Sequence, residues 1–281
     1  MDIRDGVVIQ GAGPTTTIIQ AGTTNSNGID RVIQIELDSF STSRDVVIDN
    51  VTIRYGRTAA TGHGGGINFD VYNTGVSGTL TLRNAIVTEN WAGRKGGGLY
   101  IQPDTLATTR IFNTIVGGNF KAGGAASDVT GPLHSSSGYN LIGTGGSGGL
   151  ANGVNGNQIG ATAAQLGLGP LQDNGTAGLA AYVGPRLTHG LLGGSLALDA
   201  GSNTYVDAVT YGGPYTTDAR GIGFHRKLDA GDSEDTTDEV DIGALEMHPA
   251  IGNMTDVAVI QDPPSVTVSF PFHLGDGDLG I

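Results

Sequence analysis

The residues best suited to chemistry in this sequence are carboxylates near its C-terminal end. Eight acidic residues fall in the eighteen positions from Asp229 to Glu246, with no Lys or Arg among them. Like charges at this density repel one another unless cations or water screen them, and carboxylate oxygens are ligands that Ca²⁺ prefers. The Asp-x-Asp-x-Asp-Gly order of an EF-hand loop is missing, which keeps a solvated acidic loop as the alternative. The calcium ligands expected from this pattern are Asp229, Asp232, Glu234, Asp235, Asp238 and Asp241.

Three aromatic residues recur at similar places along the chain. Tyr55, Trp91 and Phe120 each follow one of three segments that resemble one another. If these segments stack, the rings would form a ladder over a groove that binds sugars, because aromatic rings offer large flat apolar faces. Packing of the rings in a bend is the alternative. We therefore predict a ligand-binding row at these three positions.

Candidates for acid–base catalysis do not form a set. His63 lies in a Gly-His-Gly segment similar to that of polygalacturonases, but the Asp pairs with which such hydrolases work have no counterpart in this sequence. Arginine could serve as the base of a lyase, yet Arg54, Arg83 and Arg110 lie at different offsets from the repeated Asn. We therefore expect solvated arginines and no catalytic residue.

A repeat of about 30 residues must position these side chains. Val47–Ile53, Thr81–Val87 and Arg110–Val116 superpose, and their Asn residues lie 34 and 29 positions apart. Gly-Gly-Gly segments that each precede a short apolar strand, at 64–69 and 96–101, interleave with them at an offset of 32. Alternating Ile, Val and Leu with Gly at the bends is typical of a parallel β-helix, whose rungs stack about 4.8 Å apart.

Equivalent side chains in stacked rungs form rows along the solenoid axis. An Asn row can donate and accept hydrogen bonds along this axis and satisfy the backbone of a bend. We predict such a structural ladder at Asn50, Asn84 and Asn113. Helical repeats of similar length do not fit, because they need long Ala, Leu, Lys and Glu runs without Gly.

The composition favours a loop-rich β protein. Of 281 residues, 49 are Gly and 15% are charged, and Cys is absent, which excludes disulfides and thiolate metal sites. No apolar run reaches the roughly 18 residues of a membrane-spanning helix, so we expect no membrane insertion. The net charge is −13, and residues 135–281 carry 16 acidic but only 4 basic residues. This charge disfavours nucleic acid as a partner and favours cations.

A family resemblance points to the same fold. Val7–Pro14 followed by Thr17–Gln20 looks like an early rung of right-handed β-helix proteins of the pectin-lyase-like superfamily. Five later segments resemble, in the same order, the closing region of the bacterial choice-of-anchor Q group: 138–143, 169–175, 198–201, 217–221 and 241–246. The resemblance implies a secreted protein with a surface anchor, and it implies no shared reaction.

We expect an all-β protein, a right-handed parallel β-helix (solenoid) with an irregular Gly-rich C-terminal closing segment. Residues 1–131 are predicted as β-helix rungs, and residues 132–246 as loop-rich terminal rungs and a closing segment that covers the last rung. Residues 247–281 are predicted as a linker and the start of a further β domain, with two strands around Pro263-Pro264. An export signal and an anchor are expected outside this chain.

The sequence predicts a non-catalytic protein for display, adhesion or glycan contact, located outside the cell or on a bacterial cell surface. Its expected partner is a polysaccharide or a cell-surface molecule, and its only expected cofactor is Ca²⁺. The alternative is a polysaccharide lyase or glycoside hydrolase on the same scaffold. Carboxylates that converge with a basic residue in one groove would favour the enzyme, whereas a purely structural stalk would have no groove.

Overall fold

The computed structural model is an all-β protein built of stacked parallel sheets, as predicted, with 39% strand and 6% helix. It describes residues 1–11, 18–38, 40, 44–71, 77–103, 106–174, 187–207, 215–221, 224–227, 240–247, 258–262 and 265–269. For the last two of these ranges it describes the backbone alone.

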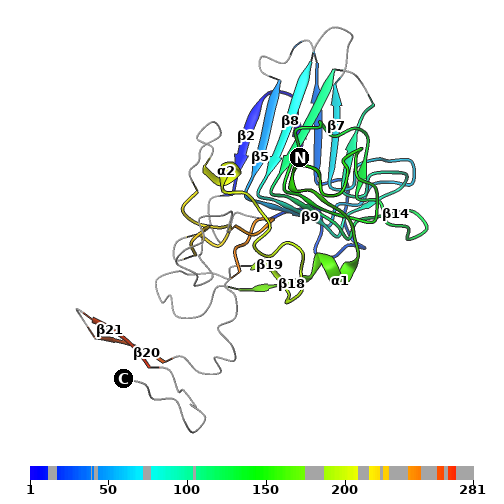
Figure 1. Ribbon diagram of the computed structural model, residues 1–281. Coiled ribbons are helices and arrows are strands. Elements are labelled where there is room, and N and C mark those ends of the chain that lie inside the picture. The colour runs from blue at the N-terminus through cyan, green and yellow to red at the C-terminus, as the bar shows by residue number, and fades with distance from the viewer. Residues whose placement is uncertain are drawn as a thin grey trace.

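Within the described residues, three parallel sheets wind into a β-solenoid of about four turns (Figure 1). Sheet A contains β1 (Asp2–Ile3), β4 (Ile33–Leu37), β7 (Ile67–Val71), β11 (Leu99–Ile101) and β15 (Val129–Thr130). Sheet B contains β2 (Val7–Gln10), β5 (Asp45–Asp49), β8 (Gly78–Arg83) and β12 (Ala107–Phe112). Sheet C contains β3 (Ile18–Gln20), β6 (Thr52–Arg54), β9 (Ile86–Thr88), β13 (Ile115–Val116), β16 (Leu141–Gly143) and β17 (Gln158–Ala161). A short ribbon of β10 (Trp91–Ala92) and β14 (Phe120–Lys121) follows sheet C.

The register of the strands explains why the repeat stacks. In sheet C, Ile53 pairs with Val87 and Val87 lies one rung before Val116, so that aliphatic side chains form a continuous column. Sheet A stacks Ile67 on Leu99 in the same way. These side chains are fully buried inside the solenoid, where each contributes about 1.5–3 kcal/mol of hydrophobic stabilisation. A shift of one residue would turn the whole column outward.

Glycine triplets allow neighbouring turns to approach closely at the entry to sheet A. Gly64 has a φ of +64°, a left-handed conformation that favours glycine. A Cβ atom on Gly65 would lie 2.5 Å from the carbonyl oxygen of Trp91 in the next turn. The triplets that mark the sequence repeat are therefore set by backbone packing between turns.

The predicted Asn residues occupy equivalent left-handed positions at the bend between sheets B and C. Asn50, Asn84 and Asn113 have φ values of 56°, 46° and 45°, a conformation that Asn tolerates better than most residues. The Asn113 side chain donates to Asn84 Oδ1 over 3.2 Å. The Asn84 side chain, in contrast, donates to Asp49 Oδ1 over 3.0 Å, while Asn50 donates to the carbonyl of Gly11 over 3.3 Å. A contact between side-chain amides therefore joins Asn84 and Asn113, while Asp49 is the acceptor for Asn84 and Gly11 is the acceptor for Asn50.

Two further amide ladders lie inside the solenoid. Asn90 donates to Asn119 Oδ1 over 3.0 Å, and Asn119 donates to Asp128 Oδ1 over 3.1 Å. In the last turns Asn140 donates to Asn157 Oδ1 over 2.8 Å. All five side chains are buried, and each unsatisfied polar group there would cost about 1–3 kcal/mol. The turns are therefore joined through buried polar side chains as well as through their apolar columns.

The closing segment covers the side of the solenoid. Its elements are the 3₁₀ turn η1 (Val154–Gly156), α1 (Ala163–Leu166), β18 (Leu168–Asp173), β19 (Leu187–Leu191) and α2 (Asn203–Asp207). The strands β18 and β19 pair in antiparallel fashion, and Thr162 caps α1 through a capping box with Gln165.

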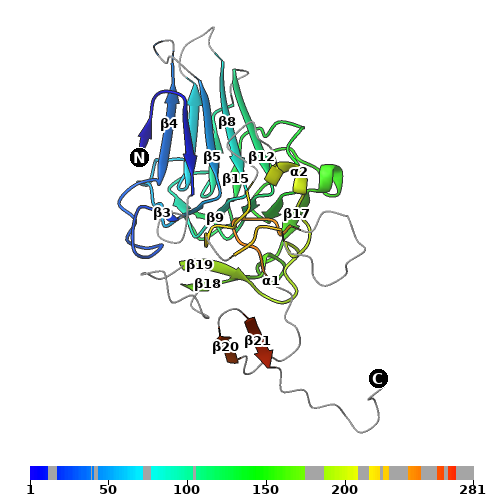
Figure 2. The ribbon, with the colours of Figure 1, turned by 90° about the vertical axis from the view of Figure 1, so that its left-hand side faces the viewer.

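We expected the closing segment to cover the last rung, and its apolar side chains pack against Ala161 of β17 and also against earlier turns. Leu166, Leu191 and Ile242 pack together with Ile86, Ile115 and Leu141, which belong to three successive strands of sheet C. Val87 and Val116, the strand neighbours of Ile86 and Ile115, face the interior instead. Strand alternation therefore gives sheet C a second apolar face, which α1, β18 and β19 approach from below in Figure 2.

Two strands lie near the C-terminal end, where the sequence predicts them. β20 (Ala258–Asp262) and β21 (Ser265–Ser269) pair in antiparallel fashion around Pro263-Pro264. In the part of the chain that the structure describes, no helix has the length and apolar character needed to cross a membrane.

Candidate functional site

The bend that follows sheet C carries two adjacent rows of residues, which we call the bend face. Its first row is Tyr55, Glu89 and Gly118, all with positive φ, and its second row is Arg57, Trp91 and Phe120. The amide of Glu89 donates to the carbonyl of Gly118, which fixes the first row in register.

Tyr55 and Glu89 adopt a backbone conformation that normally suits glycine. Their φ values are 59° and 57°, whereas the equivalent position in the next turn is Gly118. A left-handed conformation costs a non-glycine residue roughly 1–2 kcal/mol. Strained residues of this kind cluster at binding sites, which makes the Glu89 side chain the first candidate for a function.

The buried Arg54 side chain holds Glu89 and His189 together. Its Nη2 lies 3.0 Å from Glu89 Oε2, and its Nη1 lies 2.8 Å from His189 Nε2. The Nδ1 of His189 lies 2.8 Å from the carbonyl oxygen of Gly169, which requires Nδ1 to carry the hydrogen and Nε2 to accept from Arg54. Burial lowers the pKa of His189, and the charge of Arg54 lowers it further, so the imidazole is neutral. Burial also lowers the pKa of Arg54, while Glu89 opposes this shift.

A cavity of about 230 Å³ opens beside Glu89 and His189. Its apolar wall comes from Leu166, Leu168 and Pro170 of the closing segment. Sites for drug-sized ligands measure about 300–1,000 Å³, so this cavity suits one small ring. The cavity thus combines a fixed carboxylate with an apolar wall, and it exists only because the closing segment covers sheet C.

The structure brings together two of the three predicted aromatic residues. Trp91 pairs directly with Phe120, which is 40% exposed. The position equivalent to Trp91 in the preceding turn is Arg57, whose guanidinium carbon lies 4.1 Å from the centroid of the Trp91 ring. Tyr55 lies in the other row of the bend face, with the guanidinium carbon of Arg54 at 3.5 Å from its ring centroid. The row in the structure is therefore Arg57, Trp91 and Phe120, and the predicted member Tyr55 lies in the first row beside it.

The expectation of solvated arginines was wrong for two of the three. Arg54 is 2% exposed and Arg83 is 1% exposed, whereas Arg110 is half-buried. Arg83 Nε donates to Asp49 Oδ2 over 2.7 Å, and Tyr215 of the closing segment donates to the same oxygen over 2.9 Å. Burial raises the pKa of Asp49, and Arg83, Asn84 and Tyr215 oppose the shift. The repeat alignment places Asp49 and Arg83 at equivalent positions, but it could not reveal Tyr215, because the closing segment lies outside the repeat.

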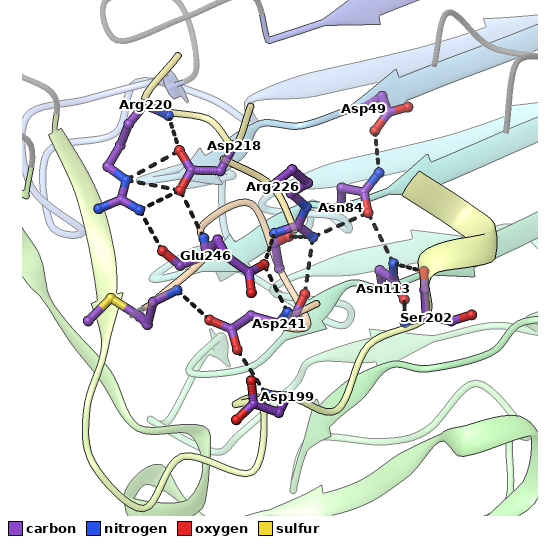
Figure 3. Close-up of polar contacts among 12 residues, drawn as sticks. Asp49, Asn84, Asn113, Asp199, Ser202, Asp218, Arg220, Arg226, Asp241 and Glu246 are labelled. Carbon is purple, nitrogen blue, oxygen red and sulfur yellow. Dashed lines mark hydrogen bonds and ion pairs between the residues drawn. The ribbon is translucent and has the colours of Figure 1, made fainter. Parts of the chain in front are cut away.

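Further buried polar contacts join the closing segment to the Asn row (Figure 3). Asn113 donates to the carbonyl of Ser202 over 2.9 Å and accepts from its amide over 2.8 Å. Arg226 donates to the carbonyls of Asp241 and Gly243 over 3.0 and 2.7 Å. Its Nη2 also lies 3.4 Å from Asn84 Oδ1.

Of the six predicted calcium ligands, the described residues include Asp241 alone. Asp229, Asp232, Glu234, Asp235 and Asp238 lie outside them. Asp241 is buried and meets Asp199 and Glu246, with one carboxylate oxygen of each within 4.8 Å of the others. Burial raises the pKa of Asp241 to about 6 and that of Glu246 to about 9, although Arg226 opposes both shifts.

His63 takes no part in these clusters. Its ring packs on Tyr100 with a centroid distance of 4.3 Å. Burial lowers the pKa of His63, and the neighbouring charges of Arg94, Lys95 and Arg31 lower it further. A neutral ring that packs on an aromatic side chain is an ordinary structural role for this residue.

Comparison of the chain with family models, with curated proteins and with solved structures found no match.

Proposed function

We propose that this protein is a non-catalytic β-helix of the pectin-lyase-like type, secreted or held at a bacterial cell surface, whose bend face contacts glycans. The observation that carries the proposal is the placement of Glu89 and of the Trp91–Phe120 pair in adjacent rows, next to a small cavity. A role in display or adhesion follows if this contact holds a polysaccharide or a glycosylated surface.

The chemistry of the bend face suits a sugar ring. A carboxylate accepts hydrogen bonds from hydroxyl groups, and charge-assisted bonds of this kind are stronger than neutral ones. Arg54 holds Glu89 in place before any ligand arrives, which lowers the entropic cost of binding. Phe120 offers an exposed ring on which an apolar sugar face can stack.

The negative charge of the protein favours neutral glycans over anionic ones as ligands. The chain has a net charge of −13, and the cavity wall includes the carboxylate of Glu89. Anionic polymers such as pectate and alginate are repelled by such a field, whereas neutral glycans are not. We therefore expect neutral polysaccharides to bind better than uronate polymers.

The runner-up function is a polysaccharide lyase or glycoside hydrolase, and Arg54, Glu89 and His189 are the observation that favours it. Hydrolysis by two carboxylates needs a second acid, and Glu89 is the only carboxylate that lines this cavity in the described part of the chain. Both ring nitrogens of His189 are engaged, by Arg54 and by Gly169. His189 would have to break one of these contacts before it could accept a proton from a substrate. Binding without turnover is therefore the better-supported function.

The test is affinity electrophoresis on gels that contain neutral or uronate polysaccharides. Wild-type protein should be retarded by a neutral polymer, and Phe120→Ala and Glu89→Gln should each weaken the affinity by roughly fivefold or more, the loss expected for about 1 kcal/mol. The matched controls are Phe40→Ala, which removes a Phe that is 87% exposed elsewhere, and Glu36→Gln, whose carboxylate pairs with Arg4. Both controls should bind as the wild type does.

Two results would count against the proposal. Equal retardation of wild type and Phe120→Ala on every polymer would remove the bend face as the binding surface. Formation of unsaturated uronates or of reducing ends by the wild type, abolished in Glu89→Gln, would establish the enzyme instead.

A further inference from the structure

Three carboxylates from two parts of the closing segment, residues 187–207 and 240–247, converge at one point beside the solenoid. Asp199, Asp241 and Glu246 each place a carboxylate oxygen within 4.8 Å of the others (Figure 3). Asp241 and Glu246 are fully buried, whereas Asp199 is exposed and has a left-handed φ of 49°. The cluster is therefore closed on the protein side and open to solvent through Asp199.

The backbone fixes the orientation of the Asp241 carboxylate. Its Oδ1 accepts from the amide of Asp199 over 2.9 Å, and its Oδ2 accepts from the amide of Met247 over 2.6 Å. A carboxylate oxygen has two lone pairs, so each oxygen retains one for a further ligand. Asp241 thus faces the cluster in a defined position, with its two oxygens held by backbone amides.

Glu246 supplies an independent observation. Its Oε2 accepts from the amide of Asp241 over 3.0 Å and lies 3.4 Å from Arg226 Nη1. Its Oε1 is buried and has no hydrogen-bond partner. A buried carboxylate oxygen without a partner is costly, so this atom requires an occupant that brings positive charge or a proton.

We propose that Asp199, Asp241 and Glu246 bind a divalent cation, with Ca²⁺ as the ion that fits best. When all three carboxylates are ionised, as in binding a cation, they and the single guanidinium of Arg226 carry a local charge of −2, which a divalent ion neutralises. The neighbouring pair of Asp218 and Arg220 is neutral as a unit. All the ligand atoms are hard oxygens, and Ca²⁺ tolerates irregular coordination that water completes on the open side.

The site differs from the acidic loop that the sequence indicates. Two of its three members, Asp199 and Glu246, are absent from the predicted ligand set, and its third member is the last residue of that set. A cation here would join the turn at Asp199 to the last described part of the closing segment, and so would hold that segment against sheet C.

The test is titration of EDTA-treated protein with CaCl₂, by calorimetry and by thermal unfolding. We expect one equivalent to bind with a dissociation constant of about 10⁻⁴ M and the melting temperature to rise in 1 mM CaCl₂. Asp199→Asn changes an exposed residue and should fold normally while weakening the affinity at least tenfold. Glu246→Gln keeps the size of the side chain but removes a charged ligand, so it should also lose the response to Ca²⁺.

The matched control is the double variant Asp232→Asn, Asp235→Asn, which alters the acidic loop and leaves the three proposed ligands intact. It should bind Ca²⁺ as the wild type does. If this variant loses binding while Asp199→Asn retains it, the cation belongs to the loop and the proposal is wrong. If the wild type gives neither heat nor a shift in melting temperature, the occupant of Glu246 is a proton, which also overturns the proposal.

Discussion

The turns of the solenoid and the closing segment satisfy their buried polar groups in different ways. Inside the turns, buried amides meet their own equivalents, as in the contact of Asn90 with Asn119, and the Asp49–Arg83 pair adds one buried ion pair between two turns. In the closing segment the buried polar groups are mainly charged, and Arg220 meets Asp218 while Arg226 meets Glu246. The two regions meet at Asp49, a residue of the turns, whose carboxylate accepts a hydrogen bond from Tyr215 of the closing segment.

The difference follows from repetition. A residue in a repeat finds the same residue one turn away, and Asn can both donate and accept, so a single residue type satisfies itself along the axis. A segment without a repeat must recognise one particular surface. Arginine and carboxylate pairs are suited to this because their geometry is specific, although burial makes them weak contributors to net stability. Amide ladders therefore recur along the turns, whereas the Arg220–Asp218 and Arg226–Glu246 pairs belong to the closing segment.

The largest effect is expected where the two regions meet. Asp49→Ala leaves the buried Arg83 without its carboxylate, and removal of one partner from a buried pair costs about 3–5 kcal/mol. Asp45→Ala, at the exposed start of the same strand, is the matched control and should cost less than about 0.5 kcal/mol. Urea unfolding measures both. Similar losses in the two variants would show that the ion pair does not hold the border.

A second test concerns the dependence of the closing segment on pH. The pKa of Glu246 is about 9 in the folded state and near 4.5 in the unfolded chain, so the folded protein keeps a proton that the unfolded chain releases between these values. The free energy of unfolding should therefore fall as the pH rises from 5 to 8, by up to about 4 kcal/mol in EDTA.

Glu246→Gln isolates this contribution because its side chain stays neutral at every pH. The comparison of its urea unfolding with that of the wild type at pH 5 and pH 8 removes the contributions of other groups. If the free energy of unfolding changes equally with pH in the variant and in the wild type, Glu246 is charged in the folded protein across this range. The buried carboxylates of the closing segment would then be fully ionised.

The smallest of these effects lies within the turns. Asn119→Ala removes the acceptor of Asn90 and the donor to the carbonyl of Val87 and to Asp128 Oδ1, and it should cost about 1–3 kcal/mol in urea unfolding at pH 7. Asn25→Ala, on an exposed loop, is the control and should be nearly neutral. A loss in Asn119→Ala no larger than that in Asn25→Ala would contradict a stabilising role for this ladder.

The sequence predicted what repeats and missed what does not. Stacking of three equivalent segments was readable because Ile, Val and Asn recur at one period, and their partners are their own copies. The burial of Arg54 was not readable, because its partners His189 and Glu89 belong to the closing segment and to the next turn. Arg54 and His189 lie 135 positions apart, one inside the repeat and one outside it, so no periodicity in the sequence relates them.

One signal for the candidate site was nevertheless present. The aligned repeat places Gly118 opposite Glu89, and a Gly at one copy of a bend position indicates a left-handed conformation at the other copies. A Glu that occupies such a position against its backbone preference stands out without any structure. The prediction of Tyr55 in the aromatic row was wrong for a similar reason. The residue equivalent to Trp91 in the preceding turn is Arg57, which is not aromatic.

The closing segment also changes how the whole molecule comes apart. A stack of turns with contacts only between neighbours can fray from either end, one turn after another. Here Tyr215, Arg226 and Ser202 each contact a different turn, through Asp49, Asn84 and Asn113. No one of these three turns can leave the stack before the segment that holds all of them has detached. Force or a protease that has removed an end turn therefore next meets these three turns as one cooperative unit, in which resistance to unravelling depends on the contacts of the closing segment.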